Sequence, residues 1–276
     1  MESRRHRHDR RGERMSEIGA VFYRGPSLLT GDPIVGILSG LDGGSHNQKT
    51  GAMVQSWILR PDLAPHDAVK TNRDDAICGD CALRGSIGAD RRCYVAPWLA
   101  PYNVYKVFRR GDYLDATWLE LQALLEGRHL RLGAYGDPAA IPFEVWRTLL
   151  VTAAGWVGYT HAWKRCDPRF RDICMASVDS EREFFEAGFK GWRTFRVRGP
   201  DDPVIAGAEC VCPASDEGRH RTTCQACQLC RGTNRPARSI VIVAHGHNGA
   251  MTAFYRSRAA VARGTSPPSV GVTESR

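Results

Sequence analysis

Apolar residues recur at helical spacing in three segments of the chain. Residues 112–126 carry leucines and a tryptophan every three or four positions and are followed by a glycine, which predicts one helix with a glycine stop. A second helix is predicted over residues 143–154, where a proline marks the first turn. A third is predicted from Ser180 through Ala187, because Ser180 has a glutamate three residues later and this pair can form a capping box.

Short β-rich runs alternate with these helices. They lie, in chain order, at 130–135, 156–160, 175–178, 192–197 and 240–244. Strands that alternate with helices roughly every 20 to 25 residues predict parallel pairing with right-handed crossovers. The predicted fold is therefore α/β, a complete or partial βα barrel, with a doubly wound open sheet as the alternative. Residues 20–76 contain scattered Gly and Pro and predict loops with one or two strands.

A single barrel-like domain over residues 18–255 accounts for this pattern, with a cysteine-rich insert at 209–232. Residues 1–17 and 256–276 lack apolar periodicity and are predicted to be disordered basic tails. Met15 is an alternative first residue, in which case the first tail would be an artefact of gene calling.

The formal charge of +8 lies mostly in the tails. Residues 1–14 hold six arginines against three acidic residues, and residues 256–276 hold four arginines against one, so each end contributes +3 and leaves +2 for the body. Basic tails bind phosphate groups without sequence specificity. Nonspecific nucleic acid is therefore an expected partner, beside an unknown substrate.

The compartment is predicted from what the sequence lacks. No apolar run reaches the roughly 20 residues that cross a membrane, and no signal peptide is visible, which predicts a cytoplasmic protein with no membrane partner.

In a reducing compartment, ten clustered cysteines favour metal ligation over the alternative of disulfides. Cys166 and Cys174 have no ligand spacing and are expected to be buried thiols.

The strongest chemical signal is the set Cys212, Cys224, Cys227 and Cys230. Two residues separate each of the last three, which lets neighbouring thiolates converge on one centre. This spacing favours a [4Fe–4S] cluster with Cys212 as the fourth ligand, and structural zinc is the alternative because zinc more usually takes two separated pairs. Cys210 is left out of the ligand set, because we expect its side chain to point the opposite way from Cys212 on a strand.

Cys78, Cys81 and Cys93 form a second candidate metal set. Three ligands leave an open position on zinc or on one iron of a cluster, where a substrate or cofactor can bind directly. His66 would instead close the shell and make an ordinary structural zinc site. Plain structural cysteines are the remaining alternative.

Polar residues follow successive predicted strands, where a βα barrel collects its functional side chains. The candidate catalytic residues are Asp137, His161 and His245. The candidate cofactor-binding residues are Tyr135, Asp179, Glu181 and Arg196, and Lys164 and His247 follow strands in the same way. Structural roles are the alternative: Asp137 would shape a turn before a proline, Asp179 would cap a helix, and His161 would be a core histidine.

Several of these segments are similar to the gene-product-88-like proteins of phages and mobile elements, a family of uncharacterised function. The similar elements are Cys93-Tyr94, Gly136-Asp137, Cys212-Pro213, the box from Thr223 to Cys230, and the run from Ser239 to His245. Together they span residues 78–245. This resemblance implies a protein of phage or mobile-element type.

More remotely, a cysteine group that ends in Cys93-Tyr94 ahead of βα units resembles a radical S-adenosylmethionine enzyme, which is built on a TIM-type barrel. The resemblance implies that Cys78, Cys81 and Cys93 hold a [4Fe–4S] cluster whose unique iron binds S-adenosylmethionine, and that the later box holds an auxiliary cluster. The spacing differs, with two and eleven intervening residues where that superfamily usually has three and two.

The sequence therefore predicts an iron–sulfur or zinc metalloprotein, in the first case a radical S-adenosylmethionine-like enzyme with an unknown substrate. The alternative is a zinc-stabilised binding protein associated with nucleic acid, in replication or regulation. The sequence leaves open whether the protein is an enzyme.

Overall fold

The computed structural model describes residues 18–44, 47–85, 90–246 and 250–256. The predicted N-terminal tail, nearly all of the predicted C-terminal tail and His247 lie outside the described residues. Every helix in the described part of the chain is too short or too polar to cross a membrane.

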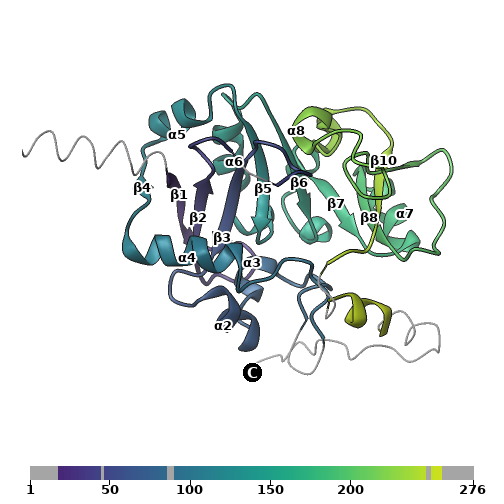
Figure 1. The fold of residues 1–276 in the computed structure, drawn as a ribbon, viewed down its shortest axis with the longest axis horizontal. Coiled ribbons are helices and arrows are strands. Elements are labelled where there is room, and N and C mark those ends of the chain that lie inside the picture. Colours follow the sequence, from purple (N-terminus) through teal and green to yellow (C-terminus); the bar gives the residue numbers. More distant parts are fainter. Residues whose placement is uncertain (1–17, 45–46, 86–89, 247–249, 257–276) are drawn as a thin grey trace, which may run out of the picture.

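Ten strands form one sheet in the order β4-β1-β2-β3-β5-β6-β7-β8-β10-β9 (Figure 1). Strand β2 is antiparallel to both of its neighbours, and the other described pairs are parallel. The strands are β1 Gly19–Pro26, β2 Pro33–Ser39, β3 Val54–Leu59, β4 Leu114–Asp115, β5 His129–Tyr135, β6 Gly155–Thr160, β7 Met175–Val178, β8 Thr194–Arg198, β9 Glu209–Val211 and β10 Ser239–Val243. Strands β4 and β9 are the two edges, so the sheet is open. The fold is α/β as predicted, and the complete form of the predicted complete or partial βα barrel is not formed.

Residues 250–256 are helical, and further α-helices connect or flank the described strands. They are α2 Pro65–Lys70, α3 Asp75–Cys78, α4 Ala100–Arg110, α5 Trp118–Leu125, α6 Phe143–Leu150, α7 Glu181–Phe189 and α8 Cys224–Cys227. Short 3-10 turns occur at Pro138–Ala140, Ala162–Lys164, Pro168–Asp172 and Gly232–Asn234. Helices α3 and α8 lie at opposite ends of the parallel strands, α8 above and α3 below in Figure 1.

The helix predicted over residues 112–126 begins only at Trp118. Thr117 Oγ1 accepts the N–H of Glu120 at 3.4 Å, and Glu120 Oε2 accepts the N–H of Thr117 at 2.7 Å. This capping box sets the start of α5. The residues before it, Leu114–Asp115, pair with β1 as a short edge strand, so the helical prediction was wrong there.

The other predicted elements are confirmed with shifted ends. Ser180 Oγ accepts the N–H of Glu183 at 3.2 Å, so the predicted cap is present. Glu183 Oε2 accepts the N–H of Asp179 rather than that of Ser180, so the reciprocal bond of the predicted capping box is not formed. Helix α6 ends at Leu150 rather than at residue 154, because Ala154 donates its N–H to Arg128 O at 2.9 Å and so leaves the helix. The first part of the chain holds three strands where one or two were expected.

The two faces of the parallel strands pack against different segments. Leu132 of β5 belongs to a large core cluster that also contains Trp146 of α6. Val157 of β6, on the opposite face, belongs to a smaller cluster that also contains Cys212 and Cys230. The cysteine-rich segment therefore covers one face of the sheet, and α6 covers the other.

Arg196 of β8 and Glu209 of β9 form a buried ion pair across β10. Arg196 Nε and Nη2 each donate to Glu209 at 2.7 Å, and both side chains are almost fully buried. We expect Arg196→Met to lower the free energy of unfolding by about 3–5 kcal/mol, because it leaves a buried carboxylate without its cation. The double variant Arg196→Met/Glu209→Leu should lose much less. Urea unfolding measures both, and equal losses in the two variants would contradict this account.

Candidate functional site

Three elements bring together the cysteine box, defined as Cys212, Cys224, Cys227 and Cys230. Cys212 follows β9, and its N–H donates to Val241 O of β10 at 2.9 Å. Helix α8 contributes the next two cysteines at its ends. The carbonyl oxygen of Cys230 accepts the N–H of Gly158 of β6 at 3.0 Å. The box is therefore fixed to the sheet through the main chain at both of its ends.

Helix α8 is also fixed to the segment that leads into β3. Cys224 donates its N–H to Lys49 O at 2.8 Å, and Gln225 donates its N–H to Thr50 O at 3.1 Å. The side chain of Gln225 makes a third hydrogen bond to this segment, since its Oε1 accepts the N–H of Ala52 at 2.9 Å. The position of the middle cysteines thus depends on residues that lie about 175 positions earlier in the chain.

The box thiols lie within electrostatic range of one another. Cys212 and Cys230 are buried, whereas Cys224 and Cys227 are half-buried. Burial raises the pKa of the Cys230 thiol above its ordinary value, and the charges of the other three box thiols raise it further. Burial also raises the pKa of Cys212 and of Cys224.

Cys210 was wrongly placed away from the box. Residues two apart on a strand point to the same face, not to opposite faces. Cys210 accordingly packs against the same small cluster as Cys212 and Cys230. Its charge contributes to the raised pKa of Cys212, after burial. Cys210 is therefore a neighbour of the box.

A second group lies at the carboxyl ends of the parallel strands. This carboxyl-edge group consists of Cys78, Cys81, Cys93, His161 and Asp179. His161 directly follows β6, Asp179 directly follows β7, and Cys78 ends α3. The N–H of Cys81 donates to Cys78 O at 3.2 Å, which folds the first two cysteines into one turn. The sequence prediction that polar residues gather after successive strands holds for these two side chains.

Asp137 joins the parts of the carboxyl-edge group. Its N–H donates to Ile77 O of α3 at 2.6 Å. Its Oδ1 accepts the N–H of Ala139 at 2.9 Å, and its Oδ2 accepts the N–H of His161 at 2.7 Å and of Ala162 at 3.4 Å. Both carboxylate oxygens are therefore engaged by the main chain, and the structural role considered for Asp137 is the one these contacts support.

Arg84 and Arg91, which both lie between Cys81 and Cys93 in the sequence, bind one buried carboxylate. Asp74 is 2% exposed and accepts hydrogen bonds from Arg84 Nη2 at 2.7 Å and from Arg91 Nη1 at 3.3 Å. Burial raises the pKa of Asp74, and the two guanidinium groups oppose that shift. The ion pair keeps the third cysteine close to the first two despite the eleven residues between them.

His161 is the most perturbed base of the carboxyl-edge group. Its Nε2 lies 3.9 Å from Asp179 Oδ2, and it has no hydrogen-bond partner within the described residues. Burial disfavours the imidazolium, but the neighbouring Cys81 thiol and then Asp179 outweigh burial and raise the pKa of His161 to about 10. An imidazole, a thiol and a carboxylate thus lie in contact range of one another.

Tyr135 lies beside the same group at the end of β5. It is 2% exposed, and its hydroxyl has no hydrogen-bond partner in the described part of the chain. Burial raises the pKa of Tyr135, and the charges of Cys78 and Cys93 act in the same direction. A buried hydroxyl without a partner is uncommon and marks a place where a polar group is missing.

Arg131 connects the two cysteine groups, and the sequence prediction missed it. Its Nη2 donates to Tyr94 Oη at 2.6 Å, and Tyr94 directly follows Cys93. The Cys224 thiol of the box also acts on the pKa of Arg131, together with Tyr94 and Tyr159. The sequence did contain a signal for this residue. Arg131 lies between two leucines in a predicted strand, and alternate side chains of a strand point to opposite faces, so its cation lies on the face opposite those leucines.

No protein-family model, curated protein or solved structure matches this chain significantly. The resemblances to gene-product-88-like proteins and to radical S-adenosylmethionine enzymes therefore stay predictions. Function is inferred from the cysteine groups and their surroundings.

The remaining predicted site residues lie apart from the two groups or serve the fold. Arg196 is held in its ion pair with Glu209. Glu181 is exposed on the first turn of α7. His245 is exposed and stacks on Tyr94 with ring centroids 5.5 Å apart. His66, the alternative fourth ligand, packs its ring edgewise on Tyr102 at 4.8 Å.

Two further predictions concern Lys164 and the unassigned cysteines. Lys164 forms an exposed ion pair with Glu183 at 2.8 Å. Cys174 is fully buried in the large core cluster, and Cys166 packs against it. The prediction that these two cysteines are buried thiols is confirmed for Cys174 and holds in part for Cys166.

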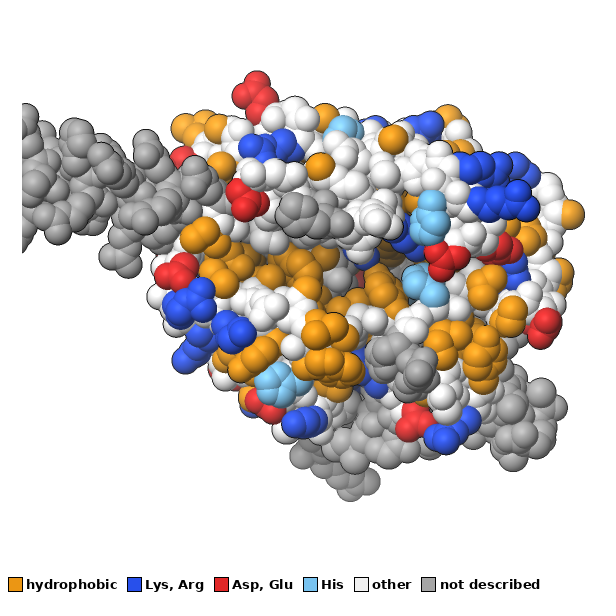
Figure 2. Space-filling view, in the orientation of Figure 1, with side chains coloured by type: hydrophobic (Ala, Val, Ile, Leu, Met, Phe, Trp, Pro, Cys, Tyr) orange, Lys and Arg blue, Asp and Glu red, His pale blue; other side chains and the backbone are white. Residues whose placement is uncertain are grey.

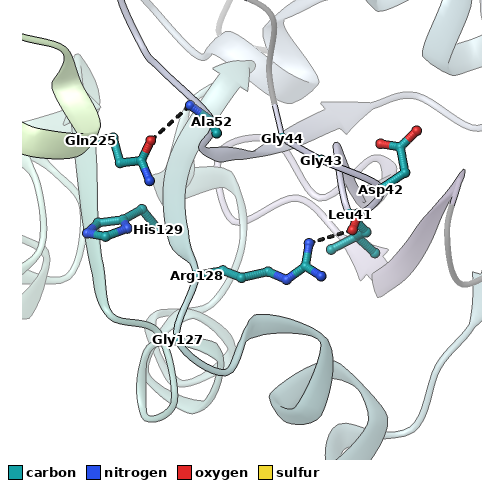
Figure 3. A pocket seen from close by; sticks show the side chains of 9 residues that line it. All are labelled: Leu41, Asp42, Gly43, Gly44, Ala52, Gly127, Arg128, His129 and Gln225. Carbon is teal, nitrogen blue, oxygen red and sulfur yellow. Dashed lines mark hydrogen bonds between the residues drawn. The ribbon is translucent and has the colours of Figure 1, made fainter.

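A cavity of about 360 Å³ lies beside α8. Figure 3 shows Gln225 of α8 and His129 at the start of β5 on one side of it, and Arg128 and Asp42 on the other. The remaining lining residues are Leu41, Gly43, Gly44, Ala52 and Gly127. The cavity holds none of the predicted catalytic residues, but it borders the helix that carries two box cysteines.

Proposed function

We propose that the protein is a cysteine-ligated metalloprotein whose box holds one metal centre, a [4Fe–4S] cluster in preference to zinc. The observation that supports this most is that Cys212, Cys224 and Cys230 pack in one cluster against the sheet, with Cys227 at the other end of α8 and within electrostatic range of Cys230. All ten cysteines of the chain are free thiols. Apolar packing accounts for the burial of Cys212 and Cys230 but not for the half-buried Cys224 and Cys227 at the two ends of α8.

The residues of the box fit such a centre by chemistry and position. No three Cys, His, Asp or Glu side chains among the described residues are arranged so that they could hold a metal ion as they stand. Binding at the box therefore requires side-chain rotation. A change of one staggered χ1 rotamer moves a cysteine Sγ by about 3 Å. The main chain that carries the thiols is already fixed by hydrogen bonds to β6 and β10.

The surroundings of the box favour a centre of negative charge. Four thiolates bring a charge of −4 to Zn²⁺ or to a cluster core, and both centres remain anionic overall. Arg131 and Lys49 each lie within electrostatic range of Cys224. The Tyr159 hydroxyl lies near the Cys230 thiol and could donate to a sulfur ligand there, as donors to cluster sulfurs do. The choice of cluster over zinc rests on the consecutive two-residue spacings in Cys224, Cys227 and Cys230.

The carboxyl-edge cysteines are proposed as a second metal-binding set. A cluster with an open iron there would bind S-adenosylmethionine, in line with the remote resemblance, and would make the protein an enzyme acting on an unknown substrate. The side chains His161 and Asp179 would then supply proton transfer beside that position. The open sheet differs from the closed barrel of that superfamily.

A second candidate function is a zinc-stabilised, nucleic-acid-associated binding protein. In Figure 2, Lys and Arg side chains gather at the upper right, over the part of the molecule that carries β10. Such a surface binds phosphate backbones with an affinity that falls steeply as salt rises. Affinity for duplex DNA that does not change between low and physiological salt would count against this candidate.

Metal analysis of protein purified without oxygen from iron-supplemented cells tests the proposal. Matched iron and sulfide with a broad absorption band near about 400 nm would support a cluster. Colourless protein with stoichiometric zinc would favour the second candidate. Protein with neither metal would contradict both.

Metal binding at the box should release protons. Because burial raises the pKa of Cys212, Cys224 and Cys230, these thiols are protonated at neutral pH and each loses its proton when it ligates. Zinc affinity is therefore expected to rise about tenfold per pH unit for each proton released. Calorimetric titration in buffers of different ionisation enthalpy counts the protons, and none released at pH 7 would contradict the account.

The metal-free protein should show the opposite pH dependence in its stability. A thiol whose pKa is higher in the folded state stabilises the fold below its ordinary value of 9.0, and this stabilisation is lost as pH rises above it. The free energy of unfolding of the metal-free chain should therefore fall above about pH 9. The metal-loaded chain should not show this fall, because its thiolates are already bound.

A further inference from the structure

We propose that His161 is the fourth ligand of a closed zinc site formed with Cys78, Cys81 and Cys93, and that Asp179 orients its imidazole. This inference deepens the proposed function, because it rests on the carboxyl-edge cysteines being metal ligands. In this site His161 occupies the fourth position that three cysteine ligands would leave open, and His66 is not a ligand. Three thiolates and one imidazole are a common donor set of structural zinc sites.

The main chain brings His161 to the cysteines. The carboxylate of Asp137 accepts the N–H of His161, while the N–H of Asp137 donates to Ile77 O, one residue before Cys78. One buried residue thus fixes the turn after β6 to the end of α3. The histidine and the first cysteine are therefore held at a common point.

A surface ion pair joins the same two segments a second time. Arg165, four residues after His161, pairs with Asp80, the residue before Cys81. The Cys81 thiol accordingly lies near the His161 imidazole and acts on its pKa. The buried contact at Ile77 and the exposed ion pair at Asp80 therefore both hold the turn with the first two cysteines beside the segment that carries His161.

The unsatisfied groups at this place indicate that a ligand is missing. His161 Nε2 and Asp179 Oδ1 are buried without hydrogen-bond partners in the described chain, and so is the hydroxyl of Tyr135. Tyr135 is 2% exposed and lies beside Cys78 and Cys93. Native structures leave few buried polar atoms unpaired. The unpaired Nε2 lies on the Asp179 side of the ring, so an ion held by the thiols and Nδ1 would leave Nε2–H free to donate to Asp179.

Asp179 is placed to support the histidine. Zinc-bound histidines usually donate the second ring N–H to a carboxylate, which fixes the tautomer and the ring orientation. Asp179 Oδ2 lies 3.9 Å from His161 Nε2, so a shift of about 1 Å makes that hydrogen bond. Nδ1 is then the ligating atom. The N–H of Asp179 donates to Glu183 Oε2 at 3.0 Å, which ties its main chain to the first turn of α7.

The neighbouring thiols favour a metal over a nucleophilic cysteine. Cys81, His161 and Asp179 resemble a thiol, base and carboxylate arranged for nucleophilic catalysis. A nucleophile needs only one thiolate, however, and the main chain holds three cysteines together here: Cys81 donates its N–H to Cys78 O at 3.2 Å, and Cys93 donates its N–H to Leu83 O at 2.8 Å. Three mutually repelling thiolates are relieved by a cation that binds all of them.

Zinc and cobalt titrations of the full chain test the inference. The parent is the Cys224→Ser/Cys227→Ser variant, in which the box cannot bind, so that only the carboxyl-edge group takes up metal. This parent should bind one Zn²⁺ per chain. His161→Ala should weaken zinc binding at least about 100-fold, and Asp179→Asn should weaken it about 10- to 100-fold.

The variant His161→Cys separates ligation from a merely structural role. A fourth cysteine can ligate where alanine cannot, so His161→Cys should recover zinc binding. With Co²⁺ as the probe, its thiolate-to-metal charge-transfer absorption should be stronger than that of the parent. A histidine needed only for folding would not be replaced by cysteine with this spectral change.

Three results would overturn the inference. Unchanged zinc affinity in His161→Ala would mean a three-thiolate site with an open position, as a cofactor-binding cluster requires. A parent that binds no zinc, with Cys81 alkylated fastest among the cysteines, would indicate a nucleophilic thiol. If His161→Cys folds like the parent but binds no metal, His161 has a structural role and is not a ligand.

Metal analysis of the chain with an intact cysteine box distinguishes failure of this inference from failure of the proposed function. Its metal content should fall from two centres to one in His161→Ala. If the box centre is present and no second centre is found before or after substitution, the inference fails and the proposed function stands. If no metal is found at the box either, the proposed function fails. This comparison also applies where the parent double variant does not fold.

Discussion

Replacing Cys230 by serine is expected to remove the metal from the cysteine box and to lower the free energy of unfolding by about 3 kcal/mol or more, because metal affinity contributes directly to folding. Cys230 is 7% exposed and packs against the sheet, and its carbonyl oxygen is bonded to β6. The serine cannot complete a soft thiolate shell. Metal analysis and urea unfolding of the same preparations measure both effects.

Cys174→Ser is the matched control for this prediction. Cys174 is also buried, but it lies in the large core cluster and outside the box. It should keep the full metal content and lose only about 1–3 kcal/mol, the cost of burying a hydroxyl without a partner. Equal metal content in the Cys230 and Cys174 variants would contradict the assignment of the box.

Asp137→Ala is expected to lower the free energy of unfolding by about 3–5 kcal/mol, because three main-chain N–H groups lose their shared acceptor in a buried place. Those groups belong to Ala139, His161 and Ala162. Asp137→Asn keeps one acceptor oxygen and should lose about half as much. The same variants should weaken zinc binding at the carboxyl-edge group, because His161 is no longer fixed beside α3.

Glu181→Ala controls for the removal of a carboxylate near the same sheet edge. Glu181 is exposed on the first turn of α7, so its replacement should change stability by no more than about 0.5 kcal/mol. A loss of similar size for Asp137→Ala would mean that water replaces the three main-chain contacts at little cost.

The parallel part of the sheet follows from sequence pattern, and the closed barrel does not. Strands β5 to β8 are short runs of mostly apolar and aromatic residues between helices or turns, and that alternation predicts parallel neighbours. A complete or partial barrel was predicted, with an open sheet as the alternative, and residues 20–76 were expected to hold loops with only one or two strands. Residues 19–59 form an antiparallel hairpin and a third strand there. Strand β2 is buried on both faces, so it lacks the alternation by which a strand is recognised.

The cysteine groups were predictable in membership but not in their contacts. The two-residue spacings in the box identify its members, because sequence neighbours are also neighbours in space. The pairing of His161 with Cys81 depends on main-chain contacts made through Asp137, across 24 to 60 residues. No local pattern reports such contacts. Arg131 was missed for the same reason, since its partner Tyr94 lies 37 residues away.

Differential alkylation of the ten cysteines, read by peptide mass spectrometry, tests the central claim most directly. Cys224 and Cys227 are half-buried, so as free thiols they should react within the same range as Cys210. If the box holds a metal, all four of its cysteines should resist alkylation in the native protein. A chelator should then render Cys224 and Cys227 reactive without changing Cys174. Alkylation of Cys224 and Cys227 at the same rate with and without chelator would contradict a metal centre at the box.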